Sequence, residues 1–270
     1  AVDLEAFVRW YFRDDVSLAE LYRGWQASTH PLARALCHPA SGPRSSPGVR
    51  MLRQAPVECV MSFICSQNNR VPRIHALVAA LRTHFGPAPL GPCAPARAFP
   101  SLTRLAAVCD AELKALGFGY RAAYVPAAAK RALELGGVRW LCGLAAPDVT
   151  SEQAMHALME LKGVGAKVAA CVALYALEKH AVVPFDVHML ALSNRVLGRR
   201  AGSTRGVSDD ERARVGSEYQ AAFGEYAGWA QALLFTREIE QTQGTPPTPK
   251  RGRKQDQETE RKQKKKKQRR

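Results

Sequence analysis

The chain has 270 residues, 46% of them hydrophobic and 23% charged, an ordinary composition for a globular protein, and no apolar run approaches the ~20 residues of a membrane-spanning helix. A membrane protein of that helical kind is therefore excluded. The formal net charge is +15. Residues 250–270 hold 12 Lys or Arg against three acidic residues and so carry +9 of this charge. The rest of the chain carries the remaining +6, which suits a polyanionic partner.

The cysteine pattern argues against disulfides and zinc. The seven cysteines are scattered along the chain and no CxxC pair is present, so a reducing, intracellular compartment is favoured. The first twelve residues mix Asp3, Glu5 and Arg9 among apolar positions, unlike a signal peptide.

Nearly every segment before residue 245 has a helical pattern. Ser17 and Glu20 form a capping box at the start of a first helix. After a loop at 38–48, Pro56 and Pro72 can each occupy the first turn of a helix. From there on the sequence predicts helix 56–67, a helix from 72 to 86, a loop over 86–100 and helix 101–116. The next helix runs to Gly136 and Gly137, and Pro126 would either kink it or delay its start. A capping box at Thr150 starts helix 151–160, which is followed by helix 166–178, an extended connection, helix 187–197, a loop over 198–207, and helices 209–223 and 226–240.

Alternating patterns are too short to predict a strand, so we expect an all-α domain over residues 1–244. Residues 245–270 have too few apolar side chains to form a core and should be disordered. Basic clusters at 250–254 and 261–270 favour a nuclear-localisation element with non-specific attraction to DNA; a solvated charge run is the alternative. The nucleus is the expected location, with a mitochondrial form as the alternative.

A glycine-containing turn separates two helical patterns within residues 151–178. Gly163 and Gly165 permit positive φ and a close approach of the backbone to a ligand. The N–H groups at the start of the second helix, together with the helix dipole, can hold a phosphate. The sequence therefore predicts a hairpin that binds DNA phosphate, whereas an ordinary αα-corner is the alternative.

This hairpin carries a family resemblance. LKGVGAKVAACV (161–172) followed by VPFDVH (183–188) resembles the helix-hairpin-helix, Gly/Pro-rich loop and aspartate of base-excision DNA glycosylases. Within that superfamily the chain is similar to the 8-oxoguanine DNA glycosylase/AP lyases, with further matches in FICSQNNRVPRI (63–74), LGFGYRAAYV (116–125) and YAGWAQALLF (226–235). The resemblance covers residues 4 to 240 and implies a multi-helix DNA glycosylase fold that acts on double-stranded DNA.

The chain departs from the family pattern in three places. Lys162 stands where a proline is usual, and Tyr175 stands where a methionine is expected. Full-length relatives also have an N-terminal β-rich domain, most of which this chain is expected to lack.

The resemblance assigns the chemistry to Lys167 and Asp186. The amine of Lys167 would attack the deoxyribose C1′, expel the base and form a Schiff base, after which β-elimination breaks the strand. A free lysine has a pKa near ~10.4, and burial and the helix dipole would both disfavour its charged form; a lysine snorkelling from a helix surface is the alternative. Asp186 would stabilise the oxocarbenium-like sugar and assist proton transfers, and it also matches a helix N-cap.

Further residues are assigned to the DNA, because an enzyme acting on a base in a duplex must flip that base out and fill the gap. The resemblance assigns Asn68, Arg73 and Arg121 to the cytosine opposite the lesion, Tyr120 to a wedge, Cys171 and Phe235 to a sandwich around the flipped purine, Gln231 to its Watson–Crick edge, and His188 to a phosphate. Without the resemblance, Cys171 and Phe235 would be interpreted as core residues. A buried structural histidine is the alternative for His188.

No cofactor is expected. Endonuclease III-like relatives bind an iron–sulfur cluster through four cysteines after the aspartate, but no cysteine follows Cys171 here. Backbone carbonyls of Met159, Leu161 and Val164 could hold a structural cation without a catalytic role. The chain is expected to act as a monomer.

The leading interpretation is a bifunctional glycosylase/AP lyase that excises oxidised purines such as 8-oxoguanine opposite cytosine. A non-catalytic helix-hairpin-helix DNA-binding module is the first alternative, since it needs the glycines but neither Lys167 nor Asp186. A monofunctional glycosylase for another lesion is the second; that type uses water as nucleophile and typically lacks the lysine.

Overall fold

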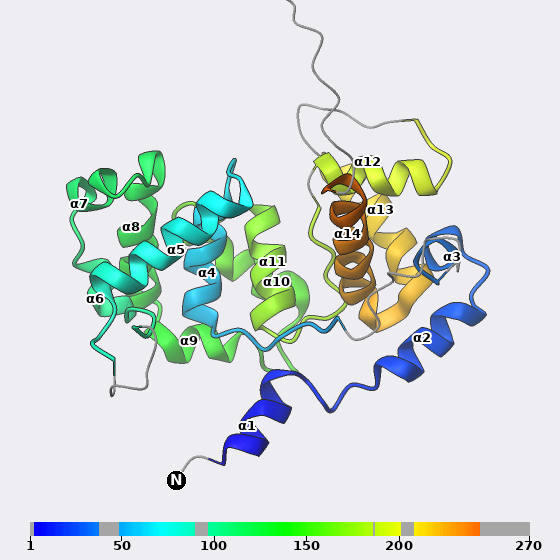
Figure 1. Cartoon of the computed structure of the whole chain (residues 1–270), viewed down its shortest axis with the longest axis horizontal. Helices are drawn as coiled ribbons and strands as arrows, with labels where there is room; N and C mark the ends of the chain where they lie inside the picture. The colour runs from blue at the N-terminus through cyan, green and yellow to red at the C-terminus, as the bar shows by residue number, and fades with distance from the viewer. Residues whose placement is uncertain (1–2, 38–48, 90–96, 186, 201–207, 244–270) are drawn as a thin grey trace, which may run out of the picture. The chain divides into compact units, whose positions relative to one another are not determined.

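The computed structural model describes residues 3–37, 49–89, 97–185, 187–200 and 208–243, and within these ranges every regular element is a helix (Figure 1). The expected all-α class is therefore confirmed. No helix in the described ranges is long and apolar enough to cross a membrane. The described residues up to 235 form one compact unit. The predicted loop at 38–48 and the tail at 245–270 lie outside the described residues, and so do Asp186 and parts of the loops predicted at 86–100 and 198–207.

The first part of the chain forms α1 (Leu4–Tyr11), α2 (Leu18–Ala27), α3 (Pro31–Cys37), α4 (Pro56–Ser66), α5 (Val71–Phe85), α6 (Leu102–Ala106) and α7 (Asp110–Ala115). The second part forms the 3-10 turn η2 (Gly119–Ala122), α8 (Tyr124–Glu134), α9 (Gly137–Gly143), α10 (Ser151–Met159), α11 (Ala166–Ala176), α12 (Val187–Val196), α13 (Asp209–Phe223), the 3-10 turn η3 (Gly224–Tyr226) and α14 (Ala227–Gln243).

The helix starts follow local capping chemistry. The box at Thr150 is complete, because Thr150 Oγ1 accepts from Gln153 N–H at 3.1 Å and Gln153 Oε1 accepts from Thr150 N–H at 2.8 Å. At α2 Ser17 Oγ caps Glu20 N–H at 3.3 Å. Pro126 lies in the first turn of α8, where an N–H would have no intrahelical acceptor, so the helix starts late instead of kinking.

Two expectations about helices were wrong. The helix predicted over 101–116 is interrupted. Helix α6 ends at Ala107, whose N–H donates to Arg104 O, and α7 starts after its N-cap Cys109, whose N–H donates to the carboxylate of Glu112. The sequence prediction also missed α1, α3 and α9. The last of these has Gly136 as its N-cap and Gly137 as its first residue, both at positive φ, a pair that is more typical of a loop.

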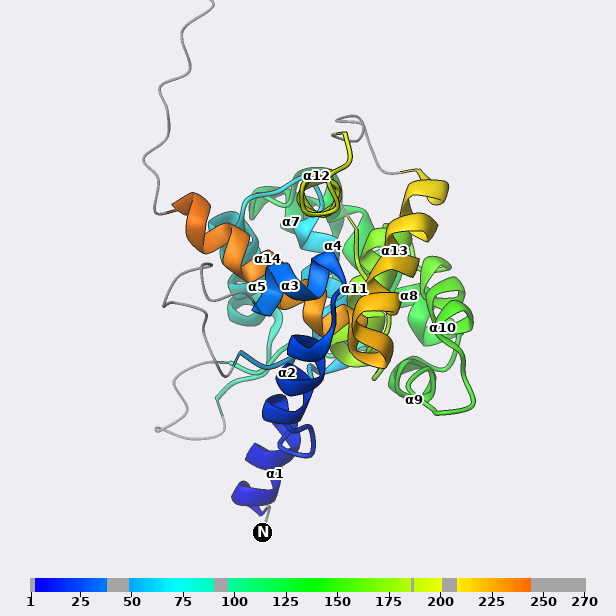
Figure 2. The same cartoon turned by 90° about the vertical axis from the view of Figure 1, so that its right-hand side faces the viewer.

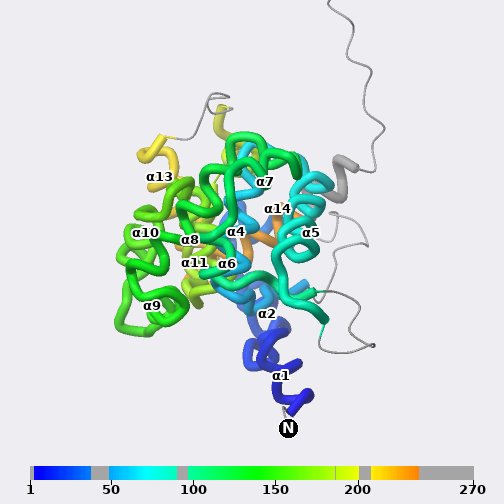
Figure 3. Tube along the Cα trace, turned by 90° about the vertical axis from the view of Figure 1, so that its left-hand side faces the viewer, coloured from blue at the N-terminus to red at the C-terminus, as the bar shows by residue number. Residues whose placement is uncertain are grey.

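Two hydrophobic clusters hold these helices together. The first is built mainly from α4 to α11 and includes Ile64, Leu81 and Val172, and the second includes Trp25 and Trp229. In the first cluster α6 contacts α8 (Figure 3), and in the second α2 contacts α3 (Figure 2). Full burial of one such large apolar side chain contributes about 1.5–3 kcal/mol, so each cluster is a substantial source of stability.

Helix α11 is central to this packing. It contacts both α4 and α10 (Figure 1), and its buried residues run from Val168 to Ala176. Four of them are alanines, whose small side chains let neighbouring helices approach closely. Helix α11 is therefore packed against its neighbours from Val168 onward, whereas its first residues, at the hairpin end, lie outside this packing.

Candidate active site and nucleic-acid interface

The hairpin between α10 and α11 turns at Gly163, whose φ is +84°. Val164 N–H donates to Leu161 O at 3.0 Å and closes the turn. A Cβ atom at Gly163 would lie 2.6 Å from Cδ2 of Tyr124, closer than real Cβ contacts come. Backbone conformation and space both restrict this position to glycine, which confirms the positive φ predicted for it.

The backbone of Gly165 has a different conformation from that of Gly163. Its φ of −99° and ψ of 179° are extended, so the prediction of positive φ was wrong at this position. It is the N-cap of α11, and a Cβ added there would meet nothing within 4 Å. Because glycine has no side chain to cap the first N–H groups, this helix start keeps the geometry that binds an external anion.

Lys167 is the second residue of α11, and its side chain is exposed. Burial was expected to help suppress its charge, and that expectation was wrong, because the buried part of α11 starts only at Val168. The favourable position at the positive end of the helix dipole remains. Lys167 lines a cavity of about 390 Å³ together with Phe185 and Gln220. Cys171 follows one helical turn later and is buried.

Two buried thiols of α4 are poor competitors as nucleophiles. Burial raises the pKa of Cys65 to about 12, and it raises the pKa of Cys59 well above its ordinary value. A thiol reacts as its thiolate, so both are inert at neutral pH. Lys167, in contrast to these two thiols, is exposed.

The loop after α11 leads toward the predicted aspartate. Asp186 itself lies outside the described residues, between the buried Phe185 and the first residue of α12. His188 is exposed on the first turn of α12, so the alternative of a buried structural histidine is wrong. Its contact with a phosphate stays a prediction.

Gln67, the C-cap of α4, joins the hairpin to the segment predicted to read the opposite strand. Its Nε2 donates to Gly163 O at 2.7 Å and to Ile64 O at 3.2 Å. Its main-chain carbonyl accepts a bond from the Tyr120 hydroxyl at 3.0 Å and another from the Arg121 guanidinium. The structure therefore brings Tyr120 and Arg121 close to the hairpin through this one residue.

The members of this set come from the segment after α4, from η2 and from the first turn of α5. Arg121 is buried, also donates to Asn68 O at 3.2 Å, and has its guanidinium carbon 4.5 Å from the centre of the Tyr120 ring. Asn68 is exposed at a φ of +43°, a conformation that asparagine tolerates. Tyr120 is 49% exposed, as a wedge requires. Arg73 donates to Gly117 O at 2.9 Å. Contacts of these four with cytosine stay predictions.

The three residues predicted to bind the flipped purine are only partly assembled. Cys171 is on α11, whereas Gln231, buried, and Phe235, half-buried, are on α14. The two helices meet at Gly228, where a Cβ would be 2.7 Å from Leu174 Cδ1. Neither the 390 Å³ cavity nor a larger one of about 800 Å³ beside Phe63 and α5 is lined by these three residues, so their joint role stays a prediction.

The predicted cation site also stays untested. Leu161 O accepts the N–H of Val164, which leaves one of its lone pairs, and the side chain of Met159 is exposed. Within the described ranges, no group of three or more His, Cys, Asp or Glu side chains is arranged to hold a metal ion.

Sequence reasoning missed two residues of this site. Gln67 stands in the polar run SQNN at the end of an apolar helix, a pattern that could have drawn attention to it. Tyr124, whose ring fills the space beside Gly163, has no such signal, because its partner lies far away in the sequence.

Comparisons with known proteins agree with this geometry. The family model of the HhH-GPD superfamily base excision DNA repair protein matches residues 61–214. An N-glycosylase/DNA lyase of Arabidopsis thaliana is 36% identical over 235 residues, which cover 85% of this chain and 60% of that protein. One of Saccharomyces cerevisiae is 31% identical over 270 residues, covering 91% of this chain and 69% of that protein.

Solved structures show the same fold. MBOgg1 in complex with a low-affinity DNA ligand has a TM-score of 0.74 at 26% identity and covers 89% of this chain and 78% of that one. The apo form of a Clostridium acetobutylicum 8-oxoguanine glycosylase/lyase has a TM-score of 0.70 over 86% of this chain and 75% of that one. At 22% identity this second likeness concerns the fold alone. The chain spans 60% of the length of the Arabidopsis thaliana relative.

Proposed function

Because the chain belongs to the HhH-GPD superfamily of base excision DNA repair proteins, we propose that it is a bifunctional DNA glycosylase/AP lyase that excises 8-oxoguanine opposite cytosine. The observation that carries this proposal is the position of Lys167, exposed on the first turn of α11 directly after a glycine-capped hairpin. Relatives named N-glycosylase/DNA lyase support it. A non-catalytic DNA-binding module would need the hairpin without this lysine.

The hairpin would act first, as a grip on the damaged strand. A phosphate at the start of α11 meets backbone N–H groups and the positive end of the helix dipole, and this contact reads no base. Since Lys167 is the second residue of the same helix, holding the phosphate would place its amine beside the adjoining sugar. Proximity of this kind can supply several kcal/mol of a reaction barrier, because the entropy cost of bringing the groups together is met in binding.

The amine of Lys167 would then attack C1′ as the base leaves, and the resulting Schiff base would permit β-elimination of the strand. Attack requires the neutral amine. With the side chain exposed in the protein alone, we propose that the damaged strand covers the amine and removes it from water, which adds to the effect of the helix dipole. Asp186, 19 positions after Lys167 in the sequence, would stabilise the developing positive charge on the sugar.

The opposite strand would be read by the loops around Gln67. Tyr120 is an exposed ring suited to fill the gap left by the flipped base, and Asn68 and Arg73 are exposed polar groups. Arg121 holds the backbone of Asn68, so it would act at least in part by orienting its neighbours. For the flipped purine itself, the groups proposed are Cys171, Gln231 and Phe235, with His188 on a phosphate.

The test is release of the damaged base from defined duplexes. Oligonucleotides with 8-oxoguanine opposite each of the four bases, with other lesions, or with undamaged guanine are incubated with the protein in EDTA, since no cofactor is expected to take part. We expect base release and strand cleavage to be fastest for 8-oxoguanine opposite cytosine. Lys167→Gln should abolish both, whereas Lys114→Gln, on the exposed face of α7, should leave them unchanged.

The outcomes separate the candidate functions. Tight binding without release of any base would refute the proposal and support a non-catalytic module. Base release that survives in Lys167→Gln would point to a monofunctional glycosylase with a water nucleophile. Fastest release from a different lesion would keep the chemistry and refute the substrate.

A further inference from the structure

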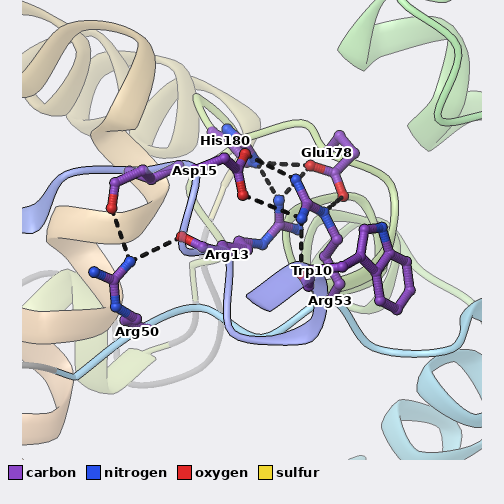
Figure 4. Close-up of polar contacts among 8 residues, drawn as sticks. Trp10, Arg13, Asp15, Arg50, Arg53, Glu178 and His180 are labelled. Atoms are coloured by element: carbon purple, nitrogen blue, oxygen red, sulfur yellow. Dashed lines mark hydrogen bonds and ion pairs between the residues drawn. The ribbon is translucent and has the colours of Figure 1, made fainter. Parts of the chain in front are cut away.

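A cluster of charged side chains surrounds the turn that follows α11 (Figure 4). Arg13, which is fully buried, donates to the carboxylate of Glu178, and its Nη1 lies 2.9 Å from Nε2 of His180. Arg53 reaches the same carboxylate from another segment, with its Nε 3.1 Å from Oε1. We call Arg13, Arg53, Glu178 and His180 the Glu178 cluster.

The two arginines are themselves anchored (Figure 4). Arg53 donates to both carboxylate oxygens of Asp15, at 3.2 and 3.0 Å, and to Trp10 O at 2.7 Å. Arg50 donates to Arg13 O at 2.8 Å. The cluster therefore ties together three parts of the chain, namely the segment after α1, the connection before α4 and the turn after α11.

Two members of the cluster hold strained backbone conformations. Arg13 has a φ of +54° and Glu178 a φ of +58°, in the left-handed region that residues other than glycine rarely adopt. Glycine is the usual residue just after a helix end in this conformation. A glutamate here is held by its ion pairs with Arg13 and Arg53, and such strain persists where the surroundings over-determine the conformation.

The turn that Glu178 begins is also bound on its far side. His180 O accepts the N–H of Gly228 at 2.9 Å, and the imidazole ring stacks on Tyr226 with 5.5 Å between ring centres. A Cβ at Gly228 would lie 2.2 Å from Val182 O, so α14 starts in direct contact with this segment. The helix that carries Gln231 and Phe235 is thus docked on the segment that Glu178 orients.

We propose that Glu178 is a positioning residue of the active site. Clamped by Arg13 and Arg53, it sets the path of residues 178–185, and this path fixes α14 relative to α11 and Lys167. None of the cluster residues is proposed to touch DNA; they act through the segment. The proposal rests on the function proposed above in one respect, because its consequence for activity presumes that Lys167 and α14 act on the same nucleotide.

A variant that removes the clamp must not simply unfold the protein. Glu178→Gly adopts the left-handed conformation without strain, and adding Arg13→Met avoids leaving a buried charge without its partner, which would be strongly destabilising. Methionine also removes Nε and Nη2, which lie buried without a partner among the described residues. The matched control is Arg9→Met with Glu5→Gln, which removes an exposed ion pair within α1.

Three measurements are made on the full chain: single-turnover excision of 8-oxoguanine opposite cytosine, the Kd for the same duplex with an uncleavable tetrahydrofuran site, and amide hydrogen exchange. For the double variant Arg13→Met/Glu178→Gly we expect the excision rate to fall at least tenfold while the Kd changes less than threefold. Exchange at Gly228 should speed up at least tenfold, whereas exchange at Ala169, bonded to Gly165 O within α11, should stay as in the wild type. The control should match the wild type throughout.

A purely structural role would change thermal stability without this split between rate and affinity. An unchanged excision rate in the double variant, or exchange at Gly228 as slow as in the wild type, would overturn the proposal. Should the wild-type protein release no base from any duplex, the proposed function has failed, and the exchange at Gly228 then decides alone whether Glu178 clamps the segment.

Discussion

Replacing Gly163 by alanine tests the geometry of the hairpin most sharply. The substitution forces an alanine to a φ of +84°, and it puts Cβ 2.6 Å from Cδ2 and 2.9 Å from Cγ of Tyr124. A non-glycine residue in a sparsely populated conformation and an overpacked contact each cost on the order of 1–3 kcal/mol. We therefore expect Gly163→Ala to lower the free energy of unfolding by roughly 2–6 kcal/mol.

The second glycine of the same turn is the matched control. Gly165 has an extended backbone, and a Cβ there meets nothing within 4 Å. Gly165→Ala should therefore leave the free energy of unfolding unchanged or raise it by about 0.4–1 kcal/mol, because alanine restricts the unfolded chain. The same variant should weaken binding to duplex DNA, since the added methyl group would lie where the proposed phosphate contact approaches the first N–H groups of α11.

The assay is urea denaturation of both variants and the wild type, followed by linear extrapolation. If Gly163→Ala were as stable as the wild type within 0.5 kcal/mol, or if the two alanine variants were equally destabilised, the assignment of Gly163 to the fold and Gly165 to the ligand would be refuted.

Three further outcomes are expected. Gln67→Met removes the donor to Gly163 O and should lower the free energy of unfolding in urea by ~1–3 kcal/mol; an unchanged value would mean that the bond contributes nothing. Burial raises the pKa of Glu178, but hydrogen bonds from His180 and Arg13 outweigh it and lower this pKa from 4.5 to about 2. The stabilising effect of the carboxylate is therefore fully present above pH 4.5 and is lost as pH falls through 2. Thermal melts from pH 5 to 2 should show a loss of thermal stability in the wild type that is smaller in Glu178→Gln, and parallel curves would contradict this. Affinity for duplex DNA should fall with salt, and Lys162→Gln should make the slope of log Kd against log salt shallower by up to ~1 if Lys162 neutralises one phosphate; a salt-independent Kd would count against DNA as the partner.

What the sequence could predict was mostly local. Thr150 with Gln153, and Gly163 at a tight turn, are decided by residues within a few positions of each other, and both were predicted. Gln67 bonds to a carbonyl 96 residues away, and Arg13 to a carboxylate 165 residues away. No local pattern announces contacts of that range, because they exist only once the helices have packed.

The exposure of Lys167 illustrates the same limit. The apolar sequence around it predicts a buried helix, and α11 is indeed buried from Val168 onward. Where the burial begins is set by how far α4 and α10 extend beside it, which the sequence of α11 does not contain. The pattern of residue types therefore predicted the helix, and the family resemblance predicted the candidate nucleophile, but neither predicted the accessibility of the amine.

The most direct test of the central claim is to locate the covalent bond to DNA. Wild-type protein is incubated with a duplex containing 8-oxoguanine opposite cytosine in the presence of borohydride, the trapped complex is digested, and the modified peptide is sequenced by mass spectrometry. The reduced deoxyribose adduct is expected on Nζ of Lys167. An adduct on another amine, or release of the base with no adduct at all, would contradict the claim that Lys167 is the nucleophile.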